Sequence, residues 1–307
     1  MNIHLPPEWK KIDIPPLSGI LMIVGGPDTG KTTFARHLFT ELCRVFPRVA
    51  YLDGDPGQTQ LGPPGTMTLS LNREGEAVFP PRGPVWRSFT GSTSPRGHQV
   101  SFLLGAARLA RKAFQRRVRA IVYDTSGFVS ASGGGTNLKW AKIELLRPRF
   151  LFAVQRGHEI EPLLRPIRLT HRVQLVELAS SPLSVRRDAE ARRRHRVKKY
   201  EEYFSGAGPL TIPLSGLAVF PGPLFDPGRL AALEDAGGFT LGVGVVEACS
   251  PDREEAVLRT PLSSVRNVDC LRIGDVSLDL QTCRDKLILP GGRPEPGERR
   301  GPGDAPA

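Results

Sequence analysis

The chain has 307 residues, with 42 Lys or Arg against 31 Asp or Glu, which gives a formal net charge of +11 at pH 7. Hydrophobic residues make up 39% of the chain and charged residues 24%, a balance typical of a folded chain long enough for two domains. No apolar run approaches the roughly 20 residues that a membrane span needs, and the amino end lacks the apolar core of a signal peptide, so we expect a cytoplasmic protein without a membrane partner.

Two features of the composition bear on partners and on redox chemistry. The cations comprise 33 Arg and nine Lys, which would suit a nucleic acid or polyphosphate ligand, although the clustering of charge carries more information than its total. The four cysteines, Cys43, Cys249, Cys270 and Cys283, are far apart and form no C-x-x-C pair. This spacing argues against a disulfide scaffold and against a thiolate zinc site.

Short apolar runs alternate with stretches of helical periodicity over the first two thirds of the chain. This alternation predicts an α/β fold in which helices flank a mainly parallel sheet. The expected strands are Ile20–Val24, Val49–Asp53, Met67–Leu71, Val85–Thr90, Ala120–Asp124, Phe150–Gln155 and Val173–Leu178. The expected helices follow Gly30 and cover Gly97–Arg117, Leu138–Leu146 and about Ser184–Phe204.

The pattern changes after the segment Ser-Gly-Ala-Gly-Pro at residues 205–209. From about Leu210, short Gly- and Val-rich alternating segments predict a small β domain. From Pro290 the chain contains only Gly, Pro, Ala, Arg, Glu and Asp, which cannot bury a core and predicts disorder. We therefore divide the chain into a nucleotide-binding domain at 1–208, a β-rich domain at 209–289 and a disordered tail at 290–307.

Residues 25–32, Gly-Gly-Pro-Asp-Thr-Gly-Lys-Thr, match the phosphate-loop pattern G-x-x-x-x-G-K-[ST] and lie between an expected strand and an expected helix. In such a loop the backbone N–H groups and the helix N-terminus surround the phosphates. Lys31 would reach the β and γ oxygens, and the hydroxyl of Thr32 would bind Mg²⁺. The motif predicts a P-loop NTPase.

Carboxylates follow two of the expected strands, at the sheet edge where a nucleotide binds. Asp53 and Asp55 stand two positions apart, so on an extended strand end one can orient the metal while the other faces an acceptor alcohol. Asp124 heads the segment Asp-Thr-Ser-Gly, which has the form of a Walker B strand or of a GTPase-like D-x-x-G switch. The residues alone do not decide which of these two strand ends supplies the carboxylate that holds the metal.

A basic segment follows the last expected strand, with eight Lys or Arg among residues 186–199. Val197, Tyr200 and Phe204 recur at helical spacing, so one face can dock on the body of the protein while arginines project from the others. The segment is a candidate lid that carries arginines to the nucleotide, a surface for a nucleic-acid backbone, or a solvated charged helix.

In this order the motifs resemble the polynucleotide 5′-hydroxyl kinase family, whose eukaryotic members include cleavage-factor and pre-ribosomal RNA-processing kinases. The resemblance covers about Gly19 to Phe204. The residues that carry it are 25–33, Asp53-x-Asp55-x-x-Gln58 with 61–65, 91–97, 124–128 and the arginine helix that ends in Tyr203-Phe204. It implies Mg²⁺-dependent transfer of the γ-phosphate of ATP, or of GTP or another NTP, to the 5′-hydroxyl of RNA or DNA.

The resemblance also implies roles for individual residues. Lys31 would contact the β and γ phosphates, Thr32 and Asp53 would hold Mg²⁺, and Asp55 would act on the attacking hydroxyl with Gln58 nearby. The remaining implied residues fall into three groups: a nucleotide group of Gly25, Gly26, Asp28, Thr29, Gly30 and Thr33; a clasp of Thr125, Gly127 and Phe128 that stacks on the terminal base; and lid arginines among Arg187, Arg192 and Arg193.

Few residues precede the first expected strand, so the chain resembles a compact prokaryotic form without the extra amino-terminal domain of eukaryotic relatives, and no obligate protein partner is implied. Two other functions stay open. A regulatory or maturation GTPase is suggested by Asp124-x-x-Gly127, although no N-K-x-D or T-K-x-D tetrapeptide is present. A nucleic-acid-binding protein switched by nucleotide would use the arginine helix equally well.

Overall fold

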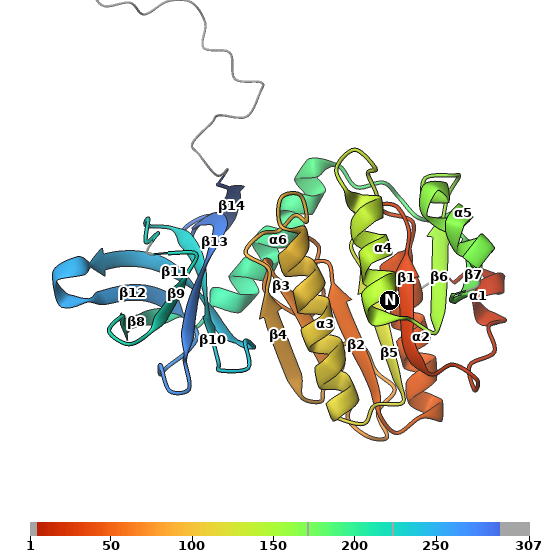
Figure 1. Ribbon diagram of the computed structural model, residues 1–307, viewed down its shortest axis with the longest axis horizontal. Helices are drawn as coiled ribbons and strands as arrows, with labels where there is room; N and C mark the ends of the chain where they lie inside the picture. Colours follow the sequence, from red (N-terminus) through yellow and green to blue (C-terminus); the bar gives the residue numbers. More distant parts are fainter. Residues whose placement is uncertain (1–4, 171, 223, 289–307) are drawn as a thin grey trace, which may run out of the picture.

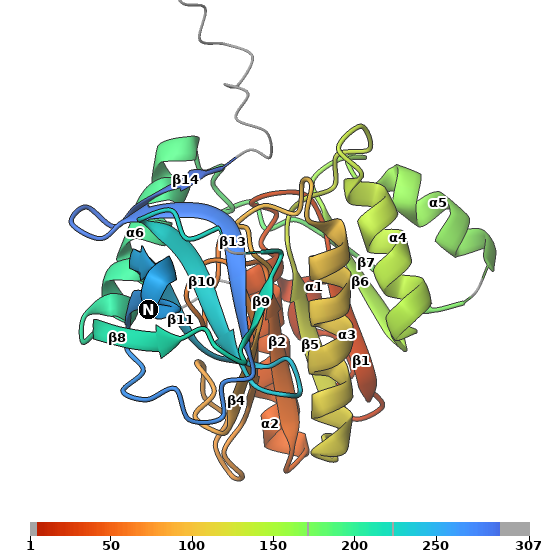
Figure 2. The ribbon, with the colours of Figure 1, turned by 60° about the vertical axis from the view of Figure 1, so that its left-hand side comes forward.

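The computed structural model describes residues 5–170, 172–222 and 224–288, and these form two β-sheets with six α-helices. One helix, α6, lies between the two sheets (Figure 1; Figure 2). The tail at 290–307, for which we expected disorder, lies outside the described residues. In the described part of the chain, no helix is both long and apolar enough to cross a bilayer.

The first sheet has seven strands in the order β4-β3-β2-β5-β1-β6-β7. Its strands are β1 (Gly19–Val24), β2 (Val49–Gly54), β3 (Thr66–Leu71), β4 (Val85–Phe89), β5 (Ala120–Thr125), β6 (Phe150–Gln155) and β7 (Gln174–Ala179). All seven expected strands are confirmed to within one residue at each end. The pairs β2–β5, β5–β1, β1–β6 and β6–β7 are parallel, which confirms the mainly parallel α/β fold.

The strands β3 and β4 depart from the expected strand–helix–strand series. Both pairs, β2–β3 and β3–β4, are antiparallel. The segments that connect them contain no helix, and a parallel pair needs a long crossover, usually helical. The edge of the sheet therefore returns on itself as an antiparallel meander.

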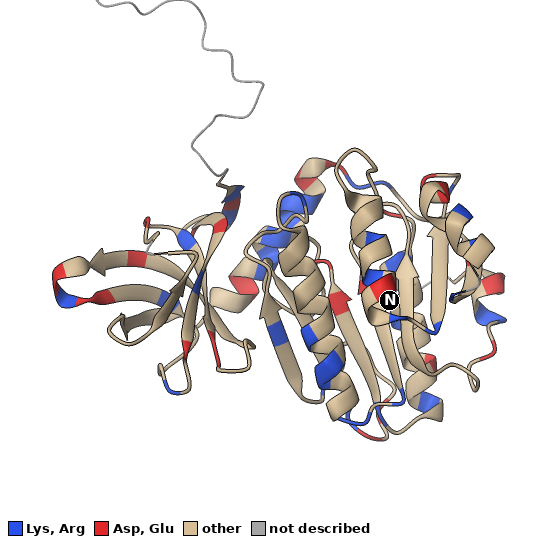
Figure 3. Ribbon diagram, viewed as in Figure 1, with Lys and Arg blue, Asp and Glu red and all other residues tan. Residues whose placement is uncertain are grey.

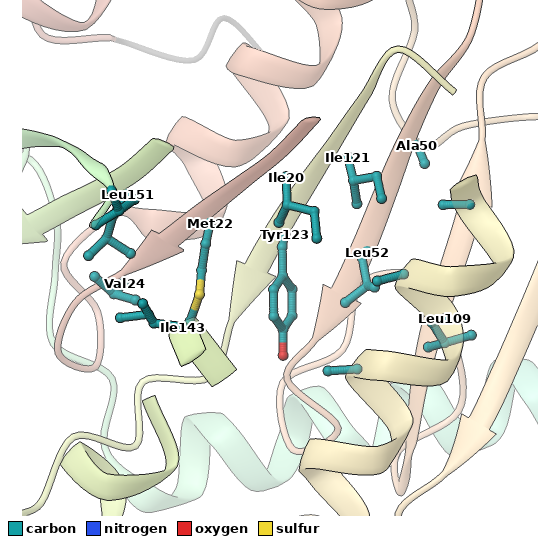
Figure 4. Close-up of a cluster of buried hydrophobic side chains, with 14 of the residues drawn as sticks. Ile20, Met22, Val24, Ala50, Leu52, Leu109, Ile121, Tyr123, Ile143 and Leu151 are labelled. Atoms are coloured by element: carbon teal, nitrogen blue, oxygen red, sulfur yellow. The ribbon is translucent and has the colours of Figure 1, made fainter. Parts of the chain in front are cut away.

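Helices cover both faces of this sheet. On β1, Ile20, Met22 and Val24 belong to a core shared with α3, α4 and α5, which Figure 4 shows in part. The alternate residues Leu21 and Ile23 belong to a second core, shared with α1 and α2. Because both faces are covered, the strand is apolar at successive positions, as parallel strands in α/β proteins are.

Three expected helices are present with altered starts, and two helices were missed. Asp188 caps α6, since its Oδ1 accepts a hydrogen bond from the N–H of Ala191 at 2.6 Å, so the helix begins after the Ser184 that we expected. The helix α5 was missed because Pro166 lies inside it. The bounds are α1 (Pro7–Lys10), α2 (Lys31–Val45), α3 (Gln99–Gln115), α4 (Gly135–Leu146), α5 (Glu161–Thr170) and α6 (Ala189–Phe204).

The second sheet is built from residues after α6 and follows the order β14-β13-β10-β11-β12-β8, with β9 beside β13. The apolar face of α6 packs onto this sheet through Val197, Tyr200 and Phe204, whose spacing predicted one docking face, and also through Tyr203. The strands are β8 (Gly208–Pro213), β9 (Ala218–Phe220), β10 (Arg229–Glu234), β11 (Thr240–Ser250), β12 (Glu255–Thr260), β13 (Cys270–Asp279) and β14 (Arg284–Leu287).

Candidate functional site

A cavity of about 870 Å³ opens where β1, β2 and β5 end at their carboxyl edge. Its walls come from five stretches of chain: the phosphate loop, the loop after β2, the loop after β4, the segment after β5, and the approach to α6 with its first turns. In open α/β sheets, ligands bind outside the carboxyl ends of the strands. The cavity is therefore the candidate active site.

The phosphate loop connects β1 to α2 as its motif predicts. Gly30 is the residue before α2 and has a φ of +94°, and no side chain caps the helix. The first N–H groups of α2 are thus left for an anion. The buried ammonium of Lys31 donates to the carbonyl of Gly26 at 2.5 Å. The cavity is lined by Asp28, Thr29, Gly30, Lys31, Thr32 and Thr33, whereas the predicted Gly25 and Gly26 do not line it.

Asp124 is placed to hold a cation beside this loop. Its carboxylate is buried, and Oδ2 accepts a hydrogen bond from the Tyr51 hydroxyl at 3.0 Å. The other oxygen, Oδ1, has no hydrogen-bond partner in the described structure. Burial raises the pKa of Asp124, while the Thr32 side chain and the charge of Lys31 act against that rise. An unpartnered carboxylate oxygen beside a hydroxyl fits the oxygen-rich ligand set of Mg²⁺.

Asp53, which we predicted to bind the metal, is hydrogen-bonded by the loop that follows β2. Its Oδ2 accepts hydrogen bonds from the Thr59 hydroxyl at 2.8 Å and from the N–H groups of Gln60 and Leu61 at 2.6 and 3.0 Å. Neither Asp53 nor Asp124 is among the residues that line the cavity, so the two carboxylates differ in their hydrogen bonds. Burial, with the neighbouring charge of Asp124, raises the pKa of Asp53 to about 7. The carboxylate therefore organises the loop after β2.

Asp55 lines the cavity as predicted. Its Oδ1 accepts hydrogen bonds from the N–H groups of Gly57 and Gln58, both at 3.2 Å, which fixes the side chain at the start of the loop. The side-chain amide of Gln58 donates to the carbonyl of Arg192 at 3.2 Å, so it ties this loop to α6. A Cβ on Gly57 would lie 2.4 Å from the carbonyl oxygen of Thr93, which shows how closely this loop meets the one after β4.

The predicted clasp follows β5 and rests on the phosphate loop. A Cβ on Gly127 would lie 2.9 Å from the Cα of Pro27. Phe128 lines the cavity and is half-buried. The hydroxyl of Thr125 is used internally, because it donates to the carbonyl of Ile23 at 2.7 Å and accepts from Lys139 at 2.8 Å.

Two of the three predicted lid arginines lie at the cavity and one does not. Arg187 and Arg192 line it, and both pair with Asp28. Arg193 instead pairs with Glu190 at 3.0 Å and lines a separate groove between α6 and the β13–β14 turn. A helix turns about 100° per residue, so positions 192 and 193 face different ways, and Arg196 joins Arg192 at the cavity. Figure 3 shows the basic residues along α6.

Comparison with known proteins agrees with this geometry. The family model described as "mRNA cleavage and polyadenylation factor CLP1 P-loop" matches residues 25–206, which is more than half of the chain. The chain belongs to the CLP1 P-loop family. The resemblance drawn from the motifs is thereby confirmed.

Relatives within and around the CLP1 P-loop family extend the comparison. The chain is 30% identical to a polyribonucleotide 5′-hydroxyl-kinase of Methanocaldococcus jannaschii, over 84% of this chain and 87% of the relative. It is 32% identical to one of Thermococcus kodakarensis, over 73% of this chain and 64% of the relative. A solved complex of Clp1p with Pcf11p superposes with a TM-score of 0.65 at 15% identity, over 88% of this chain and 77% of that one, which supports the fold.

Several residues at the cavity of this CLP1 P-loop protein escaped the sequence analysis. Arg196 could have been found, since it lies one helical turn after Arg192. Arg36 lines the cavity and stacks over the ring of Phe79 at 4.7 Å. Lys139 is fully buried behind the clasp and donates to the carbonyl of Ser126 at 2.6 Å. An isolated lysine on a helix gives no sequence signal of such burial. No group of three or more His, Cys, Asp or Glu residues suited to a metal occurs among the described residues.

Proposed function

We propose that this chain is a polynucleotide 5′-hydroxyl kinase that transfers the γ-phosphate of ATP, or of another NTP, to the 5′-hydroxyl of RNA or DNA. The proposal rests above all on one observation. A single cavity brings together the phosphate loop, the carboxylate of Asp55 and the arginines Arg187 and Arg192. The relative from Methanocaldococcus jannaschii, which matches over most of its length, is named a polyribonucleotide 5′-hydroxyl-kinase.

The nucleotide end of the cavity is built around α2. The helix N-terminus and the ammonium of Lys31 would bind the phosphates. Thr32 and Asp124 would hold Mg²⁺, in place of the pair Thr32 and Asp53 first expected, because one oxygen of Asp124 has no hydrogen-bond partner in the described structure and the Thr32 side chain acts on the pKa of Asp124. A bound Mg²⁺ would supply charge neutralisation on the transferring phosphoryl group.

The acceptor end of the cavity is built from the loops after β2 and β5. Asp55 would accept the proton of the attacking 5′-hydroxyl or orient that hydroxyl, since it is the carboxylate that lines the cavity away from the phosphate loop. Phe128 would stack on the terminal base. Gln58, bonded to α6, would keep this loop and the lid in register.

A labelling experiment tests the proposal directly. The protein is incubated with γ-labelled ATP and Mg²⁺, and with matched ribo- and deoxyribo-oligonucleotides that carry a 5′-hydroxyl. We expect label on the oligonucleotide; release of free phosphate alone would favour a GTPase-like or nucleotide-switched protein. The same assay with GTP and other NTPs ranks the donors.

Variants of Asp55 sharpen this test. Asp55→Asn removes the proton acceptor and should lower transfer by about a hundredfold or more, while binding of a fluorescent ATP analogue persists. Asp252→Asn, at an exposed position in the second sheet's β11–β12 connection, is the matched control and should leave both measurements unchanged. Retention of full transfer by Asp55→Asn would contradict the assigned role. The cytoplasmic location expected from the sequence stays a prediction.

A further inference from the structure

The phosphate loop contains a carboxylate, Asp28, that bonds to arginines of the lid segment. Asp28 has a φ of +56°, a left-handed conformation that Asp and Asn tolerate better than most residues. Its side chain is only 4% exposed. A carboxylate in a loop built for a polyanion would repel that ligand unless its charge were neutralised. The groups that bond to Asp28 therefore determine whether its charge is neutralised.

Both partners are arginines at the start of the lid. The Nε of Arg187 lies 2.9 Å from Asp28 Oδ1, and the backbone N–H of Arg187 donates to Oδ2 at 3.1 Å. The Nη2 of Arg192 donates to the same Oδ2 at 2.7 Å. Burial alone would raise the pKa of Asp28, but the hydrogen bonds from Arg192 and Arg187 lower it below its usual value. The carboxylate thus stays charged.

A second set of contacts docks the same segment on the phosphate loop. The Nη2 of Arg156 donates to the carbonyl of Asp28 at 3.0 Å and to the carbonyl of Ser184 at 3.1 Å. The hydroxyl of Ser180 donates to the carbonyl of Thr29 at 2.9 Å. The chain between β7 and α6 is therefore hydrogen-bonded to the phosphate loop, and the carboxylate of Asp28 makes the charged contact between the two segments.

The contacts with Asp28 leave each guanidinium group able to bind phosphate. Arg187 uses its Nε and Arg192 uses its Nη2, whereas an arginine carries five N–H donors. The cluster of two cations and one carboxylate keeps a net positive charge at the wall of the cavity. Asp28 can therefore hold both arginines in place while their remaining N–H groups stay available to bind phosphate.

We propose that Asp28 is a positioning residue that fixes Arg187 and Arg192 at the wall of the phosphate cavity. The inference rests on the proposed kinase function, in which these arginines stabilise the transferring phosphoryl group. It gives the carboxylate in the loop a role that does not involve direct contact with the nucleotide. Loss of its charge lowers the rate of transfer and does not weaken nucleotide binding.

The variant Asp28→Asn isolates this role. Asn accepts the left-handed backbone and matches Asp in shape, so the loop keeps its conformation while the charge is lost. We expect kcat to fall by about tenfold or more, the size expected for losing charge-assisted hydrogen bonds. The affinity for an ATP analogue should stay the same or increase, since a negative charge beside the phosphates is removed. A residue that only shaped the loop would show the opposite, with weaker nucleotide binding.

Trypsin supplies a readout that does not depend on activity. Arg186 is exposed and lies in the segment that Asp28 fastens, so Asp28→Asn should accelerate cleavage after it by about tenfold, in proportion to the loss of local stability. Asp188→Asn, two residues along the same segment, is the control because Asn also caps helices. It should leave kcat and cleavage unchanged.

The outcomes separate the inference from the function on which it rests. Lower kcat, unweakened nucleotide binding and faster cleavage in Asp28→Asn alone would support the positioning role. Weaker nucleotide binding with unchanged cleavage would overturn it, and so would an unchanged kcat. If the wild-type protein transferred no phosphate at all, the proposed function would fail, while the cleavage rates would still report whether Asp28 fastens the lid.

Discussion

Asp53 and Asp124 are direct partners in the parallel pairing of β2 with β5, yet only Asp124 retains a carboxylate oxygen without a hydrogen bond. On this difference we propose Asp124, and not Asp53, as the ligand of Mg²⁺. The carboxylate of Asp53 accepts three hydrogen bonds through one oxygen, so its loss should disturb the loop rather than the cation.

The first prediction follows from that contrast. Asp124→Asn should lower phosphoryl transfer by about a hundredfold or more and raise the Mg²⁺ concentration that gives half-maximal rate. Asp53→Asn should leave that concentration unchanged and lower the free energy of unfolding by about 1–3 kcal/mol, because it alters a carboxyl group that accepts three hydrogen bonds from the loop. Mg²⁺ titrations of the rate and urea unfolding measure both effects. A larger Mg²⁺ shift in Asp53→Asn than in Asp124→Asn would restore the original assignment.

The second prediction concerns the ring of Phe128. Stacking of an aromatic side chain on a base contributes about 1–3 kcal/mol, so Phe128→Ala should raise KM for the oligonucleotide by about 10- to 100-fold. The affinity for ATP should not change, because in the proposed function the ring contacts the acceptor and not the nucleotide. Phe225→Ala, in the second sheet's domain, serves as a comparison. An equal loss of ATP binding in Phe128→Ala would show that the clasp supports the phosphate loop instead.

How far the sequence predicts this molecule depends on whether the signal is local. The strands were found because each is a short apolar run, and the phosphate loop because eight adjacent residues define it. The helix α5 was missed because Pro166 interrupts a pattern that tertiary packing nevertheless stabilises: Leu163, Leu164 and Ile167 are buried. Local helix propensity predicts a helix poorly where the burial of its side chains stabilises it.

The chemistry of the site depends on contacts that the sequence does not contain. Asp53 and Asp124 look alike as strand-end carboxylates, and only the backbone N–H groups of Gln60 and Leu61 distinguish them. Asp28 meets Arg187 across 159 positions of the chain. Such pairings arise when the crossovers bring distant loops to one edge of the sheet, so motif spacing could suggest the participants without assigning their partners.

The third prediction concerns Lys139, which lies fully buried behind the clasp. Its Nζ donates to the Thr125 hydroxyl and to the carbonyl of Ser126. Lys139→Met should leave that carbonyl without a donor, which costs about 1–3 kcal/mol of unfolding free energy. Because the clasp loses its support, KM for the oligonucleotide should rise while ATP affinity persists. If unfolding measurements showed no loss and KM stayed constant, the clasp would not depend on this lysine.

The fourth prediction is a pH dependence of stability that originates at Lys142 on α4. Its Nζ is buried without a hydrogen-bond partner among the described residues and lies 5.2 Å from the centre of the Tyr123 ring. Burial lowers the pKa of Lys142 from 10.5 to about 7. Between these two values the unfolded chain binds one more proton than the folded chain. Stability should therefore rise with pH across this window, by up to about 1.4 kcal/mol per pH unit.

Lys142→Met separates this contribution from the other groups that titrate. Methionine has a similar length and no charge, so the variant should be more stable than the wild type at pH 7. The difference in stability between the variant and the wild type should shrink steadily towards pH 9. The reason is that Lys142 must lose its proton when the wild-type chain folds, and this loss costs less free energy as the pH rises towards 10.5. Urea unfolding at pH 7, 8 and 9 measures the difference, and Lys286→Met, at an exposed position, should show none. The prediction would be contradicted if wild type and Lys142→Met differed in unfolding free energy by the same amount at all three pH values. Lys142 would then have the same pKa in the folded and the unfolded chain.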